Sequence, residues 1–100
     1  MSLFERYTYV TGRYAFTFHI IIWDHKWDGR DYVYIHDVNE EQGERAYHIL
    51  EKELGVQGKT MEELFHLKYG ENYGTEECAD NIFRFCNKHN IENKLTVCLL

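Results

Sequence analysis

The stretch from Arg13 to Val38 reads RYAFTFHIIIWDHKWDGRDYVYIHDV, and its pattern decides the fold of this 100-residue chain. β-branched and aromatic residues dominate from Arg13 to Trp27 and again from Arg30 to Val38, which favours two strands. Asp28-Gly29 between them is typical of a hairpin turn. The chain has no proline, so nothing in these runs interrupts a ladder of backbone hydrogen bonds. The stretch therefore predicts a long antiparallel hairpin.

A two-residue turn at Asp28-Gly29 would fix which residues lie opposite each other, with Trp23 opposite Tyr34. One face of the hairpin then gathers apolar side chains, and a preceding strand that ends at Thr11-Gly12 extends it. We expect this face to form the core: Phe16, Phe18, Ile20, Ile22, Val33 and Ile35, with Tyr7 and Tyr9. The other face is amphipathic and aromatic: His19, Ile21, Trp23, His25, Trp27, Arg30, Tyr32, Tyr34 and His36.

Helices follow the hairpin. Asn39 with Gln42, and Thr60 with Glu63, are capping patterns that predict two helix starts, and Thr75 precedes a third. Gly55, Gly70 and Asn90 are the expected ends. Apolar residues recur at helical spacing within each segment: Ala46, Tyr47, Leu50 and Leu54, then Met61, Leu64 and Phe65, then Ala79, Ile82, Phe83 and Cys86.

The segment from Lys94 to Leu100 is apolar on both faces, so we expect it to be a strand in the interior of the sheet. The order of elements is βββαααβ. This order predicts a single α+β domain over residues 1–100, in two layers. A four-stranded, mostly antiparallel sheet would carry helices on one face.

Composition narrows the class of protein. Apolar residues make up 44% of the chain and aromatic residues 16%, enough for a folded core, and no apolar run approaches the roughly 18 residues that span a bilayer. Met1 to Glu5 lacks the basic and apolar pattern of a secretory leader. Three cysteines without paired spacing fit reduced thiols. We therefore expect a cytoplasmic protein.

The net charge of −6 is concentrated in one segment, since residues 37–80 hold twelve acids against four bases. Such a surface repels phosphate, so direct binding to nucleic acid is not expected. An acidic field attracts basic partners and speeds their association. The alternative is that the acids only keep the protein soluble.

The aromatic face is a candidate contact surface because Trp, Tyr and Arg are enriched among residues that dominate binding energy. The candidate partner-binding residues are the rings at the hairpin tip and the acids and amide near helix starts: Trp23, His25, Trp27, Tyr32, Tyr34, Glu40, Glu41, Glu44, Glu71, Asn72, Glu76, Glu77 and Asp80. The alternatives are that another part of the chain or a second copy covers this face, or that the turn slips by one residue.

Patterns for catalysis and metal binding are weak. The expected register brings His19 near His36, but no acid occupies a third ligand position. Cys78, near a helix start, follows Glu76 and Glu77, whose charges would raise the pKa of its thiol and disfavour nucleophilic chemistry. We therefore expect no cofactor, no metal site and no enzymatic activity.

Tyr47–Leu54 reads YHILEKEL and Tyr69–Asn72 reads YGEN, followed by a helix and a closing strand. In these segments the chain resembles barstar, an acidic ribonuclease inhibitor, over about half its length. The chain departs from barstar in opening with three strands and in lacking a strand between its later helices. The resemblance implies that an acidic helix-and-loop face, which includes Glu71 and Asn72, blocks the cationic site of a nuclease.

These observations predict a non-enzymatic acidic inhibitor, in particular an immunity protein or antitoxin that neutralises a basic nuclease toxin. One alternative is an anti-defence inhibitor of the kind phages encode. Another is a small-ligand or metal-binding α+β domain, in dimeric form, that uses the histidines and rings of the aromatic face.

Overall fold

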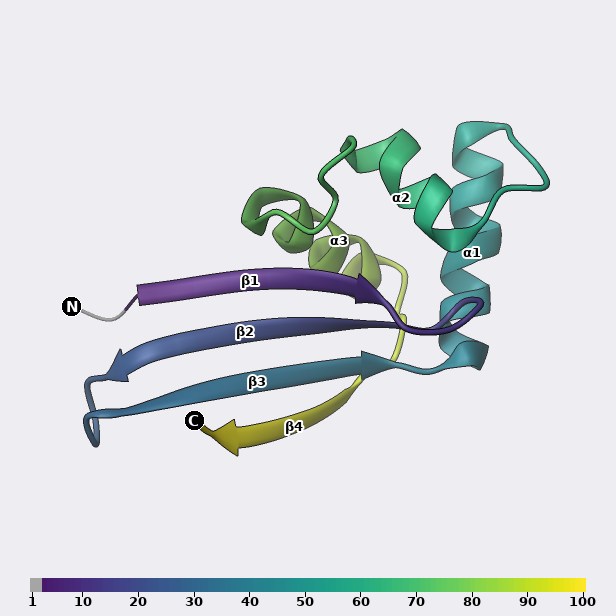
Figure 1. Ribbon diagram of the computed structural model, residues 1–100. Coiled ribbons are helices and arrows are strands. Elements are labelled where there is room, and N and C mark those ends of the chain that lie inside the picture. The colour runs from purple at the N-terminus through teal and green to yellow at the C-terminus, as the bar shows by residue number, and fades with distance from the viewer. Residues whose placement is uncertain (1–2) are drawn as a thin grey trace.

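The computed structural model describes residues 3–100 and has the predicted order of elements (Figure 1). Met1 and Ser2, part of the segment inspected for a leader, lie outside the described residues. The elements are β1 (Leu3–Val10), β2 (Phe16–His25), β3 (Arg30–Val38), α1 (Glu40–Leu54), α2 (Met61–Tyr69), α3 (Glu76–Lys88) and β4 (Lys94–Leu99). The strands form one antiparallel sheet in the order β1-β2-β3-β4. The chain is a small α+β fold, as predicted.

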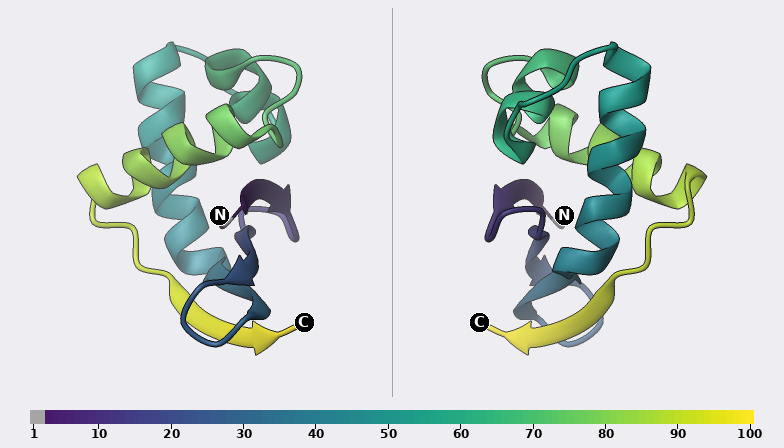
Figure 2. Two further views of the ribbon diagram at one scale, coloured as in Figure 1. Left: turned by 90° about the vertical axis from the view of Figure 1, so that its left-hand side faces the viewer. Right: turned by 90° about the vertical axis from the view of Figure 1, so that its right-hand side faces the viewer.

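The helices lie on one side of the sheet and cover only part of it. Figure 1 shows α1, α2 and α3 gathered toward one end of the strands, while the β2–β3 hairpin projects well beyond them. The end-on views show α2 and α3 above the sheet and α1 running down beside it (Figure 2). The molecule is therefore elongated, with principal extents of 47 × 24 × 22 Å.

The predicted boundaries of α1 and α2 are confirmed, and α3 follows Thr75 as predicted but ends at Lys88, before the expected Asn90. The Asn39 side chain accepts a hydrogen bond from the Gln42 amide at 2.8 Å, which caps α1. Gly55 ends that helix in the left-handed conformation, with φ of 65°. Thr60 and Glu63 form the reciprocal capping box of α2.

The register of the β2–β3 hairpin differs from the prediction. Tyr34 pairs with Ile20 rather than with Trp23, because the connection is the loop 26–29 and not the dipeptide Asp28-Gly29. Gly29 has φ of 68° and its amide donates to the His25 carbonyl at 2.7 Å. Asp28-Gly29 thus fills the last two positions of a longer turn, in which only the glycine needs the left-handed region.

The shift by three residues moves one strand's side chains to the opposite face, since side chains alternate along a strand. Tyr32, Tyr34 and His36 lie on the helix side with Phe16 and Phe18. Val33 and Ile35, predicted for the core face, lie on the side without helices. Tyr7 and Tyr9 join them there, because Tyr7 pairs with His19 and Tyr9 with Thr17. The predicted assignment of side chains to the two faces was therefore wrong for β1 and β3.

The prediction for the last strand was also wrong in its position. β4 is an edge strand, and its residues from Lys94 to Val97 are exposed. Its apolar side chains point to both faces of the sheet, but at this end of the sheet neither face is covered by helices (Figure 1). An apolar pattern on both faces is typical of a buried strand, but in β4 it occurs in a strand whose faces are exposed.

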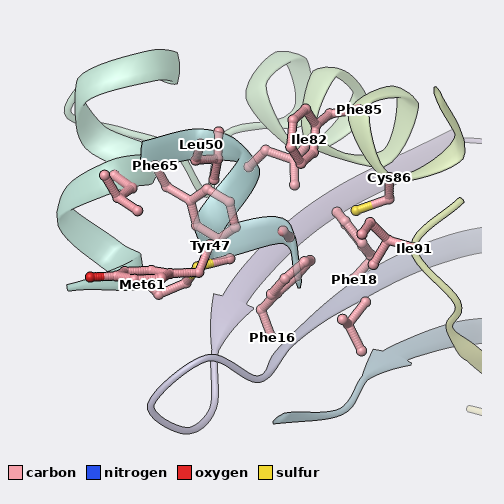
Figure 3. Packing of buried hydrophobic residues seen from close by; sticks show 13 residues of the cluster. Phe16, Phe18, Tyr47, Leu50, Met61, Phe65, Ile82, Phe85, Cys86 and Ile91 are labelled. Atoms are coloured by element: carbon pink, nitrogen blue, oxygen red, sulfur yellow. The ribbon is translucent and has the colours of Figure 1, made fainter. Parts of the chain in front are cut away.

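The core lies between the covered part of the sheet and the helices (Figure 3). Phe16 packs edge-on against Phe65 of α2, with ring centroids 5.2 Å apart, and Phe18 packs edge-on against Phe83 of α3. The predicted inward helix residues are buried, apart from the partly exposed Leu54 and Phe83: Ala46, Tyr47, Leu50, Met61, Leu64, Phe65, Ala79, Ile82 and Cys86.

Glu53 joins the three helices through its carboxylate. It hydrogen-bonds Lys68 of α2 and lies 3.6 Å from the His89 ring at the end of α3. The hydrogen bond from Lys68 lowers the pKa of Glu53 below its ordinary value of 4.5, against a smaller opposing effect of burial. The ionised carboxylate therefore stabilises the fold.

We expect Glu53→Gln to lower the free energy of unfolding near neutral pH by up to about 1 kcal/mol, a modest effect because the pair is partly exposed. The stabilisation is present above the unfolded-state pKa and is lost as the pH falls through the lower folded-state pKa, so the difference should vanish in acid. Urea unfolding at neutral pH and at about pH 3 measures it. Glu92→Gln, which changes an exposed loop carboxylate, is the control.

Candidate protein-interaction surface

Two rows of side chains cross all four strands on the helix side of the sheet. The first row runs Phe4, Ile22, Tyr32 and Leu99, and the second runs Arg6, Ile20, Tyr34 and Val97. Side chains of directly paired residues lie on the same face, so these rows form one continuous surface. We call these eight residues the platform. All but Arg6 are apolar or aromatic.

Most of the platform is open because the helices reach only its β1 side, where Asp80 of α3 lies beside Arg6. The next row along the sheet, which contains Phe18 and His36, lies under Phe83 of α3, with ring centroids 5.4 and 5.2 Å away. Figure 1 shows that α3 begins over β1 and that, in the described part of the chain, no helix lies over the hairpin end of β2 and β3. Phe4, Val97 and Leu99 are accordingly about half exposed. Contiguous apolar surface of this kind is a candidate interaction site.

Helix α3 forms a wall at one border of the platform. Arg6 of the platform lies 3.8 Å from Asp80 of α3, and Arg84 holds the same carboxylate at 3.1 Å. Behind this ion pair is a small cavity of about 120 Å³, where Phe18 and Ile20 of the sheet face Phe83 of the helix. The sheet and α3 therefore meet in a concave corner with an apolar floor and a charged wall.

The first turn of α3 adds negative charge beside this corner. Glu76 and Glu77 are exposed and precede Asp80 on the same helix. Carboxylates at a helix start interact favourably with the helix dipole, which accounts for them without any partner. Their exposure also leaves them free to meet basic side chains.

The hairpin tip carries further aromatic groups. Trp27 is 79% exposed, and the Lys26 ammonium lies 4.9 Å from the centre of its ring. His25 packs edge-on against Tyr32 at 5.5 Å. The Tyr32 hydroxyl donates to Asp28, and this hydrogen bond raises the pKa of Tyr32 and lowers the pKa of Asp28. The tip thus continues the aromatic surface of the platform through Tyr32.

The structure divides the other predicted contact residues among three places. Glu40, Glu41 and Glu44 begin α1, at the end of the sheet away from the hairpin tip (Figure 1). The Glu40 carboxylate accepts a hydrogen bond from the Tyr14 amide at 2.9 Å and so has a structural role. Glu71 and Asn72 are exposed in the turn before α3, and Trp23 points to the opposite face of the sheet.

Sequence reasoning missed the apolar part of the platform. Ile20 and Ile22 were assigned to the core, and Val97 and Leu99 to an interior strand. The available signal was the two-sided apolar pattern of β4 together with the short helical segments. At about 1.5 Å per residue the 15-residue α1 is about 22 Å long, shorter than the roughly 33 Å of the 10-residue β2, so no single helix lying along the strands covers them from end to end.

Within residues 3–100, no helix covers the second face of the sheet. Its strands present Tyr7 and Tyr9, stacked with ring centroids 6.3 Å apart, and Tyr9 lies edge-on to His19. Ile21 and Ile35 continue this face across β2 and β3. It is more mixed than the platform, because polar groups alternate with the apolar ones.

The geometry gives little support for a metal site or for a nucleophilic cysteine. His19 and His36 point to opposite faces of the sheet, so the expected proximity of their side chains was wrong. Within residues 3–100, no three His, Cys, Asp or Glu side chains gather as a metal-binding group. The Cys78 thiol donates to the Tyr69 carbonyl at 2.8 Å, and burial raises the pKa of Cys86 to about 12.

No family model, curated protein or solved structure matches this chain. None of the helices in the described part of the chain is long and apolar enough to cross a membrane.

Proposed function

We propose that this chain is a non-enzymatic inhibitor that binds a basic protein, in particular an immunity protein or antitoxin that neutralises a nuclease toxin. The observation that carries the proposal is the concave corner in which the open apolar platform meets the acidic start of α3. The chain's net charge of −6 favours a partner of opposite sign.

The two parts of the corner would have different effects on binding. Burial of Tyr32, Tyr34 and the neighbouring aliphatic side chains would supply most of the affinity, since rings in the centre of an interface dominate binding energy. Glu76 and Glu77 at the border would speed association and orient the partner, since charges at an interface rim act mainly on the association rate.

A nuclease offers matching chemistry. Its substrate-binding site must hold phosphates with Lys and Arg, and carboxylates can take the place of those phosphates. The resemblance of Tyr69–Asn72 to the barstar loop is consistent with this mode of inhibition. A phage inhibitor of a bacterial nuclease would use the same chemistry. The neighbouring genes would distinguish an immunity protein, encoded beside a toxin, from a phage inhibitor, encoded among phage genes.

The cavity behind Arg6 and Asp80 is too small to hold a drug-sized ligand. Its volume of about 120 Å³ is well below the roughly 300–1,000 Å³ of such ligand sites. It is of a size to accept one side chain, while the exposed Glu76 and Glu77, rather than Asp80, which Arg6 and Arg84 already hold, would attract a basic one.

The first nuclease to test is any basic nuclease whose gene lies beside the gene of this chain. We expect an equimolar amount of the chain to stop cleavage of a fluorescent nucleic-acid substrate, with an association rate that falls roughly tenfold or more between about 50 and 500 mM salt. Glu76→Gln/Glu77→Gln should slow association more than Glu40→Gln/Glu41→Gln, which removes the same charge at the far end of the sheet. Uninhibited cleavage, or equal rates at both salt concentrations, would contradict the proposal.

A further inference from the structure

Strand β4 leaves one edge of the sheet open. Within the described residues it pairs with β3 alone. The Leu100 amide donates to the Asp31 carbonyl at 2.9 Å. This hydrogen bond shows which residues of β4 direct their backbone amides and carbonyls toward β3. Because these directions alternate, Thr96 and Cys98 bond to β3 while the amides and carbonyls of Leu95, Val97 and Leu99 point outward.

Apart from Lys94 at its start, the outer edge of β4 carries none of the features that normally prevent strand pairing. Natural edge strands are protected by proline, bulges or charged residues. β4 pairs with β3 in continuous register, and Lys94 at its start is its only charged residue. At the other edge of the sheet, β1 carries Glu5 and Arg6, and the loop before α3 brings Gly74 close to the Thr8 carbonyl. The two edges are therefore not equivalent.

We propose that the outer edge of β4 pairs with the same edge of a second copy of this chain, antiparallel and centred on Val97. A two-fold axis between identical strands requires the antiparallel arrangement. Leu95 of one copy would lie opposite Leu99 of the other, and the two platforms would join in one continuous sheet.

The chemistry of β4 favours a second copy over the basic partner proposed above. The chain has 17 acidic residues, and none of them lies in residues 93–100, so the edge offers nothing to a cation. For the same reason, two copies can approach here without placing carboxylates against each other. The apolar side chains of Leu95, Val97 and Leu99 are about half exposed and complement their own copies.

A single pair of strands gives a small interface. Stable complexes bury about 1,200–2,000 Å², and one strand pairing lies at or below the low end of this range. We therefore expect a reversible dimer that dissociates on dilution through the micromolar range.

Val97→Pro tests the proposal by sedimentation equilibrium. The Val97 amide points outward, so proline there removes no hydrogen bond to β3, and edge strands tolerate proline at such positions. Val97→Thr keeps the amide and the branched shape and is the matched control. We expect dimers from the parent chain and from Val97→Thr, and a folded monomer from Val97→Pro. A monomeric parent chain, or a Val97→Pro dimer of unchanged strength, would overturn the proposal.

Disulfide formation tests the register without relying on a proline variant. Pairing about Val97 places residue 96 of one copy opposite Cys98 of the other, at a position where the backbones approach to about 4.5 Å between Cα atoms, within disulfide range. Thr96→Cys should therefore give a covalent dimer on mild oxidation, while Thr96→Cys/Cys98→Ser should not. Absence of the covalent dimer from Thr96→Cys would refute this pairing, whatever the outcome of the nuclease assay.

Discussion

Replacing Tyr34 with arginine is expected to weaken binding to the basic partner by at least about 30-fold, because central tyrosines contribute about 2 kcal/mol or more at interfaces. Tyr34 lies in the middle of the platform, paired with Ile20 on one side and Val97 on the other. The substitution removes a ring from the floor of the corner and adds a positive charge against a positively charged protein. Titration calorimetry with the nuclease measures the loss.

Tyr9→Arg is the matched control. Tyr9 is also a strand tyrosine, 46% exposed, but it lies on the opposite face of the sheet with Thr17. We expect its replacement to leave the dissociation constant within about threefold of the parent value. If Tyr9→Arg weakened binding as much as Tyr34→Arg, the partner would be responding to charge alone or docking on the other face.

Gly43→Ala is expected to destabilise the fold by about 3 kcal/mol, although alanine is the better helix former. Gly43 is buried in α1, against the backbone of the loop between β1 and β2. A Cβ atom there would lie 2.0 Å from the Tyr14 carbonyl oxygen, which is backbone and cannot swing aside. The helix must therefore move away from the sheet. Urea unfolding gives the free energy directly.

Gly12→Ala separates this backbone clash from the mere addition of a methyl group. A Cβ at Gly12 would meet the Glu40 carboxylate at 1.9 Å, but that group ends a flexible side chain. It can rotate away at the cost of its hydrogen bond to the Tyr14 amide, about 1 kcal/mol. Equal destabilisation by the two variants would show that α1 is not held by close backbone contact at Gly43.

The local parts of the fold were predictable from sequence because they depend on neighbouring residues. Asn39 and Thr60 cap the helices they were expected to cap, and Gly55 ends α1 as predicted. A cap needs only a side chain and an amide within one turn of the same helix. The alternation of apolar residues likewise sufficed to identify the strands.

The hairpin register was not predictable from the dipeptide alone. Asp28-Gly29 fits both a two-residue turn and the end of a longer loop, and the hydrogen bonds of Asp28 to Arg30 and Tyr32 stabilise the longer one. A bulge between Ile22 and His25 changes the pairing further. These features depend on the turn and on contacts between strands, which the dipeptide does not specify. A register shift by an odd number of residues moves every side chain of a strand to the opposite face of the sheet.

The aromatic and acidic character of the candidate surface was predictable from sequence, but the residues that form it were not. Tyr32 and Tyr34 are on it, and Glu76, Glu77 and Asp80 lie at its border, yet Glu40, Glu41 and Glu44 lie at the other end of the sheet. The sequence does not reveal how far each helix extends over the strands. That extent determines that Phe4, Ile20 and Leu99 are surface residues.

Hydroxyl-radical footprinting of the chain in complex with the nuclease tests the central claim most directly, since it reads the exposure of each ring separately. The platform proposal predicts that oxidation of Phe4, Tyr32 and Tyr34 falls several-fold on complex formation, while oxidation of Tyr9 on the opposite face does not change. Protection of Tyr9, with Tyr32 and Tyr34 oxidised as in the free protein, would contradict it.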